Sequence, residues 1–258
     1  MSVLLESIIG SSLQLQMNRP ESMNAISSEL ANSLLSAVLA AGKNKKIRAI
    51  IISGAGGRAF CAGTDLKERR HLNADEKWEQ SRALFHLNGA IRNSSLPVIA
   101  AIDGWCLGGG FELALYCDLR IATPESRFGW PEMTLGAYPG GGGAVMLPRI
   151  IGQAKAKELF FTARRIGASE ALDLGIINKI TSKDQLIEKA QEFVAGIETT
   201  SPLGLAAIKK SINDGADIPF GEAVKIDQAL RRPLEATEDY SEGLLAHFEK
   251  RRPIFKGK

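Results

Sequence analysis

The apolar stretch from Val98 to Cys117 constrains this chain more than any other part of its sequence. Asp103, Glu112 and several glycines interrupt the stretch, so it cannot form the uninterrupted apolar helix that crosses a membrane. A stretch this apolar must instead be buried in the core of a globular protein. We expect a buried strand over 98–102, followed by a glycine turn and a short helix over 111–116.

Apolar periodicity predicts strands that alternate with helices along the first part of the chain, and helices alone after about residue 153. This order predicts an α/β core over residues 1–200 and a helical region over residues 201–258. We expect the helical region to be an oligomerisation element. The expected strands cover a hairpin over 3–17 and the segments 47–53, 98–102 and 119–122, and the expected helices cover 27–41, 75–92, 111–116, 153–162, 169–174, 183–198, 203–213, 222–229 and 240–250.

The composition excludes several classes of protein and site. The 32 basic and 29 acidic residues give a net charge of +3, which is too balanced to predict nucleic-acid binding. Three cysteines without C-x-x-C spacing and three scattered histidines predict neither a disulfide framework nor a metal site. The segment Met1–Glu6 lacks the positive charge and long apolar run of a secretory signal, so we expect a cytoplasmic protein without membrane insertion.

A glycine-rich loop over 54–67 directly follows the strand expected at 47–53. Gly54, Gly56 and Ala59 match the G-x-G-x-x-A pattern of dinucleotide-binding proteins. The loop continues instead of opening a helix at once, and no Gly-Lys-Ser/Thr follows it. We therefore reject both a dinucleotide site and a P-loop.

Three successive glycines at 108–110 precede Glu112 at the start of an expected helix. Glycines let backbone N–H groups approach a ligand closely, and a helix N-terminus adds positive potential there. These are the components of an oxyanion hole. Glu112 is a candidate catalytic carboxylate, although a carboxylate in the first turn can also serve only as a charge partner of the helix N-terminus.

Glu132 is the second candidate carboxylate. It follows Pro131 in an apolar neighbourhood that includes Trp130, and desolvation there would raise its pKa toward that of a general acid. The alternative is a solvated carboxylate on the surface. The four glycines at 140–143 permit close approach of the backbone to a substrate, although such a run alone is usually a simple turn.

Five motifs in sequence resemble the motif series of the enoyl-CoA hydratase and isomerase (crotonase) family. Each motif is modest alone, but their order along nearly the whole chain is highly specific. The resemblance implies a crotonase-like spiral of ββα units with a C-terminal helical trimerisation region. The motifs are Asn18-Arg19-Pro20 with Asn24-Ala25, the segment Ala59 to Lys67, the segment Gly104 to Leu113, the segment Pro131 to Gly143, and Glu249-Lys250-Arg251.

The same resemblance implies a role for each residue of the reaction site. The backbone N–H groups of Thr64 and Gly109 are expected to form the oxyanion hole that polarises a thioester carbonyl. Glu112 is assigned to the activation of water and Glu132 to the proton on the α carbon, and the N–H of Gly140 is expected to help hold the water. The presence of both glutamates favours hydration or dehydration, which needs two acid/base groups.

The resemblance also implies a coenzyme A path along the segment from Ala62 to Lys67, with Lys67 as a candidate phosphate contact. Lys250 is expected to reach the coenzyme A of a neighbouring subunit. Trp130 stands where hydratases often carry glutamine, which makes the acyl pocket bulkier and more apolar. Coenzyme A belongs to the substrate, so we expect no separate cofactor. The candidate substrate-binding residues are Ala62, Asp65, Leu66, Lys67, Trp130, Gly140 and Lys250.

The leading functional hypothesis is an enoyl-CoA hydratase that acts on an acyl-CoA thioester as a homotrimer or a homohexamer. Within the same fold, the alternatives are an enoyl-CoA double-bond isomerase and a carnitinyl-CoA-type dehydratase. An alternative of another class is a protein that keeps the fold without turnover or binds RNA. The even charge balance speaks against RNA.

Overall fold

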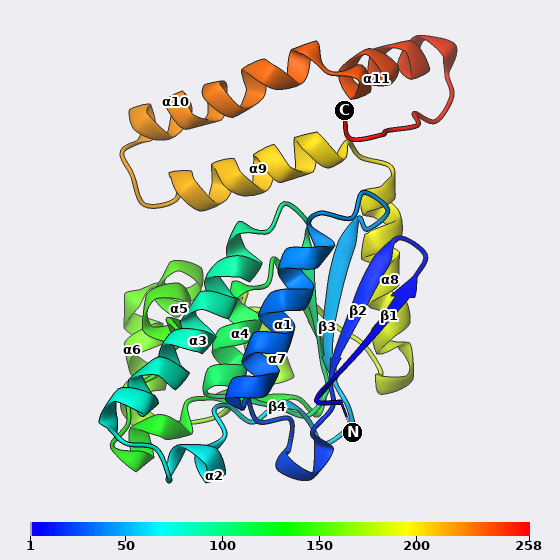
Figure 1. The fold of residues 1–258 in the computed structure, drawn as a ribbon. Coiled ribbons are helices and arrows are strands. Elements are labelled where there is room, and N and C mark those ends of the chain that lie inside the picture. Colours follow the sequence, from blue (N-terminus) through cyan, green and yellow to red (C-terminus); the bar gives the residue numbers. More distant parts are fainter. Residues whose placement is uncertain (1) are drawn as a thin grey trace.

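The computed structural model describes residues 2–258 and contains a six-stranded sheet (Figure 1). The first two strands form the antiparallel hairpin expected at 3–17, in which Leu4 faces Met17, and the other neighbouring strands are parallel. The strands in spatial order are β1 (Leu4–Ile9), β2 (Ser12–Met17), β3 (Ala49–Gly54), β5 (Val98–Ile102), β7 (Leu119–Ala122) and β10 (Lys179–Ile180).

Four short strands form a second sheet. The chain passes from β3, β5 and β7 of the large sheet directly to successive strands of the small sheet, and then into helical segments. These repeated ββα turns confirm the expected spiral. The strands of the small sheet are β4 (Ala59–Cys61), β6 (Trp105–Leu107), β8 (Arg127–Gly129) and β9 (Ile166–Gly167).

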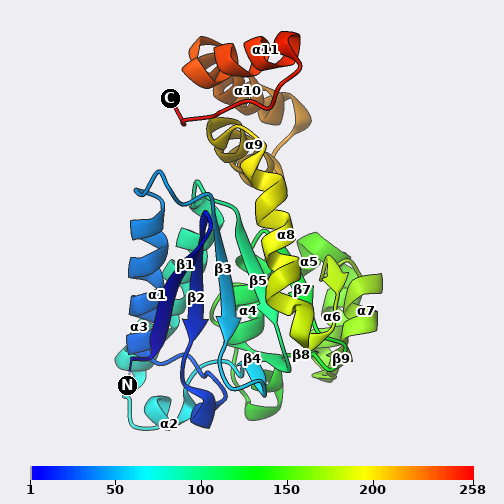
Figure 2. The same ribbon diagram turned by 90° about the vertical axis from the view of Figure 1, so that its right-hand side faces the viewer.

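Helices cover both faces of the large sheet (Figure 2). In β3, Ile50 and Ile52 pack into the main core, whereas Ala49 and Ile51 pack under the helix over 186–198 on the opposite face. A strand points successive side chains to opposite faces, which explains its continuous apolar sequence. The helices up to this point are α1 (Ser28–Ala41), α2 (Leu66–Arg69), α3 (Ala74–Asn93), α4 (Gly109–Tyr116), α5 (Gly143–Ile151), α6 (Gln153–Thr162), α7 (Ala168–Asp173) and α8 (Leu186–Glu198).

Three helices after α8 project away from the sheets (Figure 1). They are α9 (Pro202–Gly215), α10 (Phe220–Arg231) and α11 (Glu238–Glu249). Large apolar side chains remain exposed on all three. Gathered apolar groups of this kind mark surfaces that bind another protein. The exposed residues include Ile208, Ile212, Phe220, Phe248 and Leu244.

The structure adds elements that the sequence did not predict. Helix α5 begins at Gly143 and includes Pro148, two residue types that normally signal a turn. Strands β4, β6 and β8 are three residues long, too short for alternation of apolar residues to show. No helix within residues 2–258 is both long and apolar enough to cross a membrane.

Lys209 fixes α9 to the core. Its Nζ donates to the carbonyl oxygens of Ile91 and Leu96, both at 3.0 Å, and to Oδ2 of Asp118 at 2.7 Å. Only 10% of its side chain is exposed. The ammonium therefore ties α9 to the end of α3, where Asn213 also exchanges hydrogen bonds with Arg92, and to Asp118 just before β7.

Replacing Lys209 with methionine should lower the free energy of unfolding by about 1.5–3 kcal/mol, because two carbonyls and a carboxylate lose their charged hydrogen-bond donor. Urea-induced unfolding measures the loss. Lys210→Met is the matched control, since the one partner of Lys210 among residues 2–258 is Asp214, on the exposed side of α9. The control should cost roughly 0.5 kcal/mol. Equal losses for the two variants would show that Lys209 does not anchor the helix.

Candidate active site

Helix α4 begins against two loops, and its glycines allow that contact. Gly108 has φ of 49°, a conformation that favours glycine, and a Cβ there would lie 2.1 Å from Oε1 of Glu132. A Cβ at Gly109 would lie 2.8 Å from Cδ2 of Leu84, and one at Gly110 would lie 2.5 Å from the carbonyl oxygen of Cys61. The glycine triplet therefore brings the helix N-terminus into direct contact with its surroundings.

The loop that carries Thr64 is held on both sides of that residue. Ile26 donates its N–H to the carbonyl of Gly63 at 2.7 Å, and Asp65 donates its N–H to the carbonyl of Ile26 at 2.9 Å. The N–H of Thr64 has no hydrogen-bond partner within residues 2–258. It lies 3.5 Å from the Cβ position of Gly109. The amides of these two residues thus border the same space.

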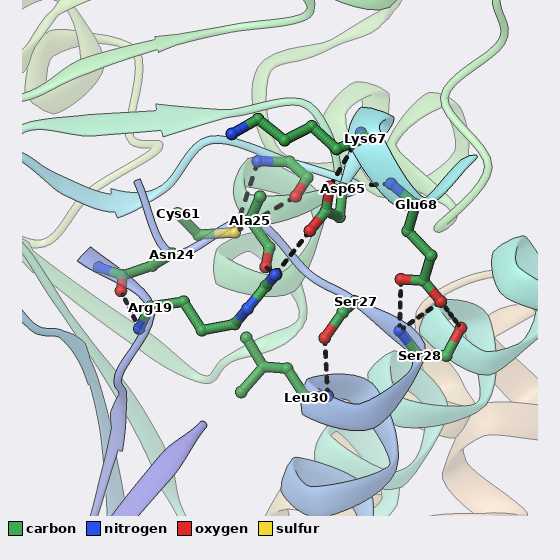
Figure 3. Close-up of polar contacts among 11 residues, drawn as sticks. Arg19, Asn24, Ala25, Ser27, Ser28, Leu30, Cys61, Asp65, Lys67 and Glu68 are labelled. Atoms are coloured by element: carbon green, nitrogen blue, oxygen red, sulfur yellow. Dashed lines mark hydrogen bonds and ion pairs between the residues drawn. The ribbon is translucent and has the colours of Figure 1, made fainter. Parts of the chain in front are cut away.

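Asp65 links this loop to Arg19 and to the start of α2 (Figure 3). Its carboxylate accepts from the Arg19 guanidinium at 2.7 Å and from the N–H groups of Lys67 and Glu68 at the start of α2. Burial acts to raise the pKa of Asp65, but the Arg19 hydrogen bond and the two amides bring it below its usual value. The side chain expected on the coenzyme A path is therefore engaged with the protein.

Glu112 is buried, with 1% of its surface exposed. Its Oε2 accepts from the N–H of Gly141 at 2.8 Å, and its Oε1 accepts from the N–H of Gly143 at 2.7 Å. A Cβ at Gly141 would lie 2.6 Å from Oε2, so glycine is required there. The carboxylate is bound to a different segment and is not a solvated charge at a helix end. Sequence reasoning had expected the amide of Gly140 in this region and missed these two.

Glu132 lies in the short 3-10 helix η2 (Pro131–Leu135), beside the N-terminus of α4. Burial raises the pKa of its carboxyl, and its own N–H and that of Gly109 oppose the rise. Gly109 is the first residue of α4, so its N–H has no partner within the helix. One helix end therefore faces a carboxyl group and the unpaired amide of Thr64 together.

The charge of Glu132 contributes to the raised pKa of Glu112. Burial raises the pKa of Glu112 to about 7, the amides of Gly143 and Gly141 oppose the rise, and the charge of Glu132 adds to it. Perturbed, interacting carboxyls in one place are typical of acid/base sites, because each can take or give a proton near neutral pH. The amides beside them can stabilise negative charge that develops on an oxygen.

A pocket opens over this arrangement and separates the predicted residues into two groups. Ala62, Thr64, Leu66, Glu132 and Gly140 line it. Sequence reasoning assigned no role to several other lining residues, because those in α2 and α3 give no motif signal and those in the Pro131 to Gly143 motif were not distinguished from their neighbours. These are Arg69, Ser81, Leu84, Pro131, Leu135, Ala137 and Tyr138.

The remaining predicted residues lie outside the pocket lining; they are Glu112, Gly109, Asp65, Trp130, Lys67 and Lys250. Trp130 is 1% exposed and packs between Phe111 and Phe160, with ring centroids 4.4 and 4.3 Å away. It belongs to the core behind the pocket. Lys67 is exposed, and Lys250 ends α11 in the region that projects from the core. Within one chain, the structure does not bring Lys250 to the pocket.

Comparison with known proteins gives consistent matches over the whole chain. A family model described as enoyl-CoA hydratase/isomerase matches residues 8–258. The Bacillus subtilis protein YngF is 41% identical over 241 residues, 93% of each chain. The crotonyl-CoA hydratase of Syntrophomonas wolfei is 36% identical, over 95% of this chain and 94% of the relative. The crystal structure of an enoyl-CoA hydratase from Bacillus anthracis matches with a TM-score of 0.96 and 34% identity, over 99% of this chain and 100% of that chain.

The raised pKa of Glu112 should make stability depend on pH. Its folded value is about 7 against an ordinary 4.5, so folding favours the protonated form, and this stabilisation is complete below pH 4.5 and lost as the pH rises through 7. Glu112→Gln is neutral at every pH. Its free energy of unfolding should therefore rise relative to the wild type between pH 5 and pH 8, by up to ~3 kcal/mol. Urea unfolding across this range measures the difference.

Glu125→Gln is the control, since it removes an exposed carboxyl from the same part of the chain. Its difference from the wild type should stay constant over the same pH range. A constant difference for Glu112→Gln as well would mean that Glu112 is solvated in the folded protein.

Proposed function

This chain belongs to the enoyl-CoA hydratase/isomerase family, and from that premise we propose that it is an enoyl-CoA hydratase, which reversibly adds water to a 2-enoyl-CoA thioester. The observation that carries the proposal is a pair of carboxyls with raised pKa values: Glu132 lines the pocket, and its charge adds to the raised pKa of the buried Glu112. Hydration needs one group that takes a proton from water and one that gives a proton to carbon. A site with a single carboxyl would instead favour a reaction that moves a proton without the addition of water.

The proposed reaction follows from the position of each group. The thioester oxygen accepts from the N–H groups of Thr64 and Gly109, which draws electrons from the conjugated double bond. Glu112 takes a proton from water as the oxygen bonds to C3, and Glu132 gives its proton to C2. Exchange with solvent then restores both carboxyls. Coenzyme A takes part only as the carrier of the acyl group.

The glycine turn at 140–143 serves the water-activating side of this reaction. Gly141 and Gly143 hold both oxygens of Glu112, so the carboxylate has a fixed direction before substrate arrives. Gly140 lines the pocket itself, and its N–H, which has no acceptor within residues 2–258, is available for the water. Fixed donors and acceptors lower the reorganisation needed in the transition state.

Coenzyme A would lie along the loop from Ala62 to Lys67, with exposed Lys67 near its phosphates. We place Lys250 at the coenzyme A of a neighbouring subunit, because α11 projects away from the pocket of its own chain. This arrangement requires an oligomer, and the exposed apolar side chains of α9–α11 supply a surface for one. A homotrimer, or a hexamer made of two trimers, is the proposed assembly.

Purified protein should hydrate crotonyl-CoA, seen as loss of the absorbance of the conjugated thioester. Glu112→Gln and Glu132→Gln should each lower kcat by roughly 10²- to 10⁴-fold, since each removes one acid/base group. Binding of a saturated acyl-CoA, measured by calorimetry, should persist in both. Glu125→Gln should retain wild-type turnover because its carboxyl is exposed and lines no part of the pocket.

Product analysis separates this function from its neighbours. A 3-enoyl-CoA converted to the 2-enoyl form, with no hydroxyacyl product at any time, would identify an isomerase instead. Full activity after either glutamate substitution would remove the two-carboxyl mechanism.

A further inference from the structure

Arg69 is the one basic residue in the lining of the pocket that contains Thr64 and Glu132. It is the last residue of α2 and is half-buried. The neighbouring walls are largely apolar and include Leu84, Leu135 and Pro131. A guanidinium is always charged at physiological pH, so its presence among apolar groups needs a charge partner or a polar ligand.

The guanidinium is held at one end and left open at the other. Its Nη1 donates to the carbonyl of Lys77 and to Oε1 of Gln80, both at 3.0 Å, and to Oγ of Ser81 at 3.4 Å. Its Nη2 and Nε have no acceptor in the described chain, and no carboxylate among residues 2–258 lies within 4.0 Å of it. Contacts with α3 thus orient the fork but leave its charge unpaired.

Gln80 provides a second, independent observation. It is 7% exposed, and its Oε1 must face Arg69, because a guanidinium can only donate hydrogen bonds. This orientation leaves Nε2 as a buried donor, which has no partner within residues 2–258. Unpaired buried donors are rare in folded proteins and call for an acceptor. Two side chains that touch each other therefore both carry donors without an acceptor in the described chain.

An anionic group of the substrate would give the free nitrogens of Arg69 an acceptor in the pocket, while Gln80 holds the guanidinium from behind. Coenzyme A offers phosphates, but these fit the exposed Lys67, whereas Arg69 shares its pocket with Glu132, where the acyl chain reacts. The forked guanidinium matches a carboxylate, which can accept two parallel hydrogen bonds. The position and shape of the Arg69 guanidinium therefore favour an anionic group on the acyl chain over the phosphates of coenzyme A.

We propose that Arg69, supported by Gln80, binds a carboxylate at the distal end of the acyl group, so that the preferred substrate is a 2-enoyl-CoA with an acidic acyl chain. The inference rests on the proposed hydratase function and deepens it by naming the class of substrate. Arg69 acts as a specificity residue and takes no part in proton transfer.

Two thioesters with the same number of chain carbons test this: glutaconyl-CoA, which ends in a carboxylate, and 2-pentenoyl-CoA, which ends in a methyl group. The wild type should show a kcat/KM at least roughly 10-fold higher for glutaconyl-CoA. Arg69→Met should lower kcat/KM for glutaconyl-CoA roughly 10- to 100-fold and leave 2-pentenoyl-CoA within about threefold. Arg69→Lys, which keeps the charge but loses the fork, should fall between them.

Arg70→Met is the matched control, because Arg70 is the next residue, is exposed and donates only to His71. It should leave both rates unchanged. Equal losses with both thioesters in Arg69→Met would overturn the proposal and indicate a phosphate contact or a purely structural role. Equal wild-type rates for both thioesters would also overturn it.

Binding measurements test the acidic acyl group separately from the hydratase function. Calorimetry with the unreactive saturated pair, glutaryl-CoA and valeryl-CoA, needs no turnover. Tighter binding of glutaryl-CoA that is lost in Arg69→Met would support the role of Arg69 even if no enoyl thioester were hydrated. Absence of hydration would then reject only the hydratase function. Equal binding of the saturated pair would reject the acidic acyl group, whatever the enzyme hydrates.

Discussion

The site depends on a carboxylate that is buried against backbone amides. Glu112 has almost no contact with water, and the N–H groups of Gly141 and Gly143 replace the hydrogen bonds it would make there. Burial still prevails over these bonds, since the pKa rises to about 7. The group is therefore held in place and yet exchanges its proton near neutral pH, which a solvated glutamate does not do.

The ββα spiral explains how distant segments reach this carboxylate. Each turn of the spiral places a strand in both sheets and then delivers a loop or helix on the same side: the Thr64 loop after β4, α4 after β6, and η2 with the glycine turn after β8. Glycine occurs where backbones meet, because a Cβ at Gly108, Gly110 or Gly141 would overlap a neighbour. The fold thus brings the loops close, and the glycines determine how closely.

Sequence reasoning predicted the parts of this structure that depend on local patterns. The hairpin over 3–17, the buried strand β5 and the capped helix α1 follow from alternation, apolar runs and the Ser27 cap, and the structure confirms them. Helix α5 and the amides of Gly141 and Gly143 were missed, because a glycine run has no side chain to show which amide points inward. Arg69 and Gln80 were missed because their meeting depends on how α2 packs against α3, which no single segment encodes.

Unpaired buried side-chain atoms occur on Glu132 and on residues that contact Arg69 or the glycine turn at 140–143. The four buried side-chain atoms without a partner in residues 2–258 are Nε2 of Gln80, Oδ1 of Asn88, Nε1 of Trp130 and Oε2 of Glu132. Gln80 contacts Arg69, Asn88 donates to the carbonyl of Gly141, and Trp130 lies 3.1 Å from the Cβ position of Gly143. Each such atom costs stability on the order of 1–3 kcal/mol. For Oε2 of Glu132, which lines the pocket, a bound substrate can supply the missing partner, so the cost is recovered during function.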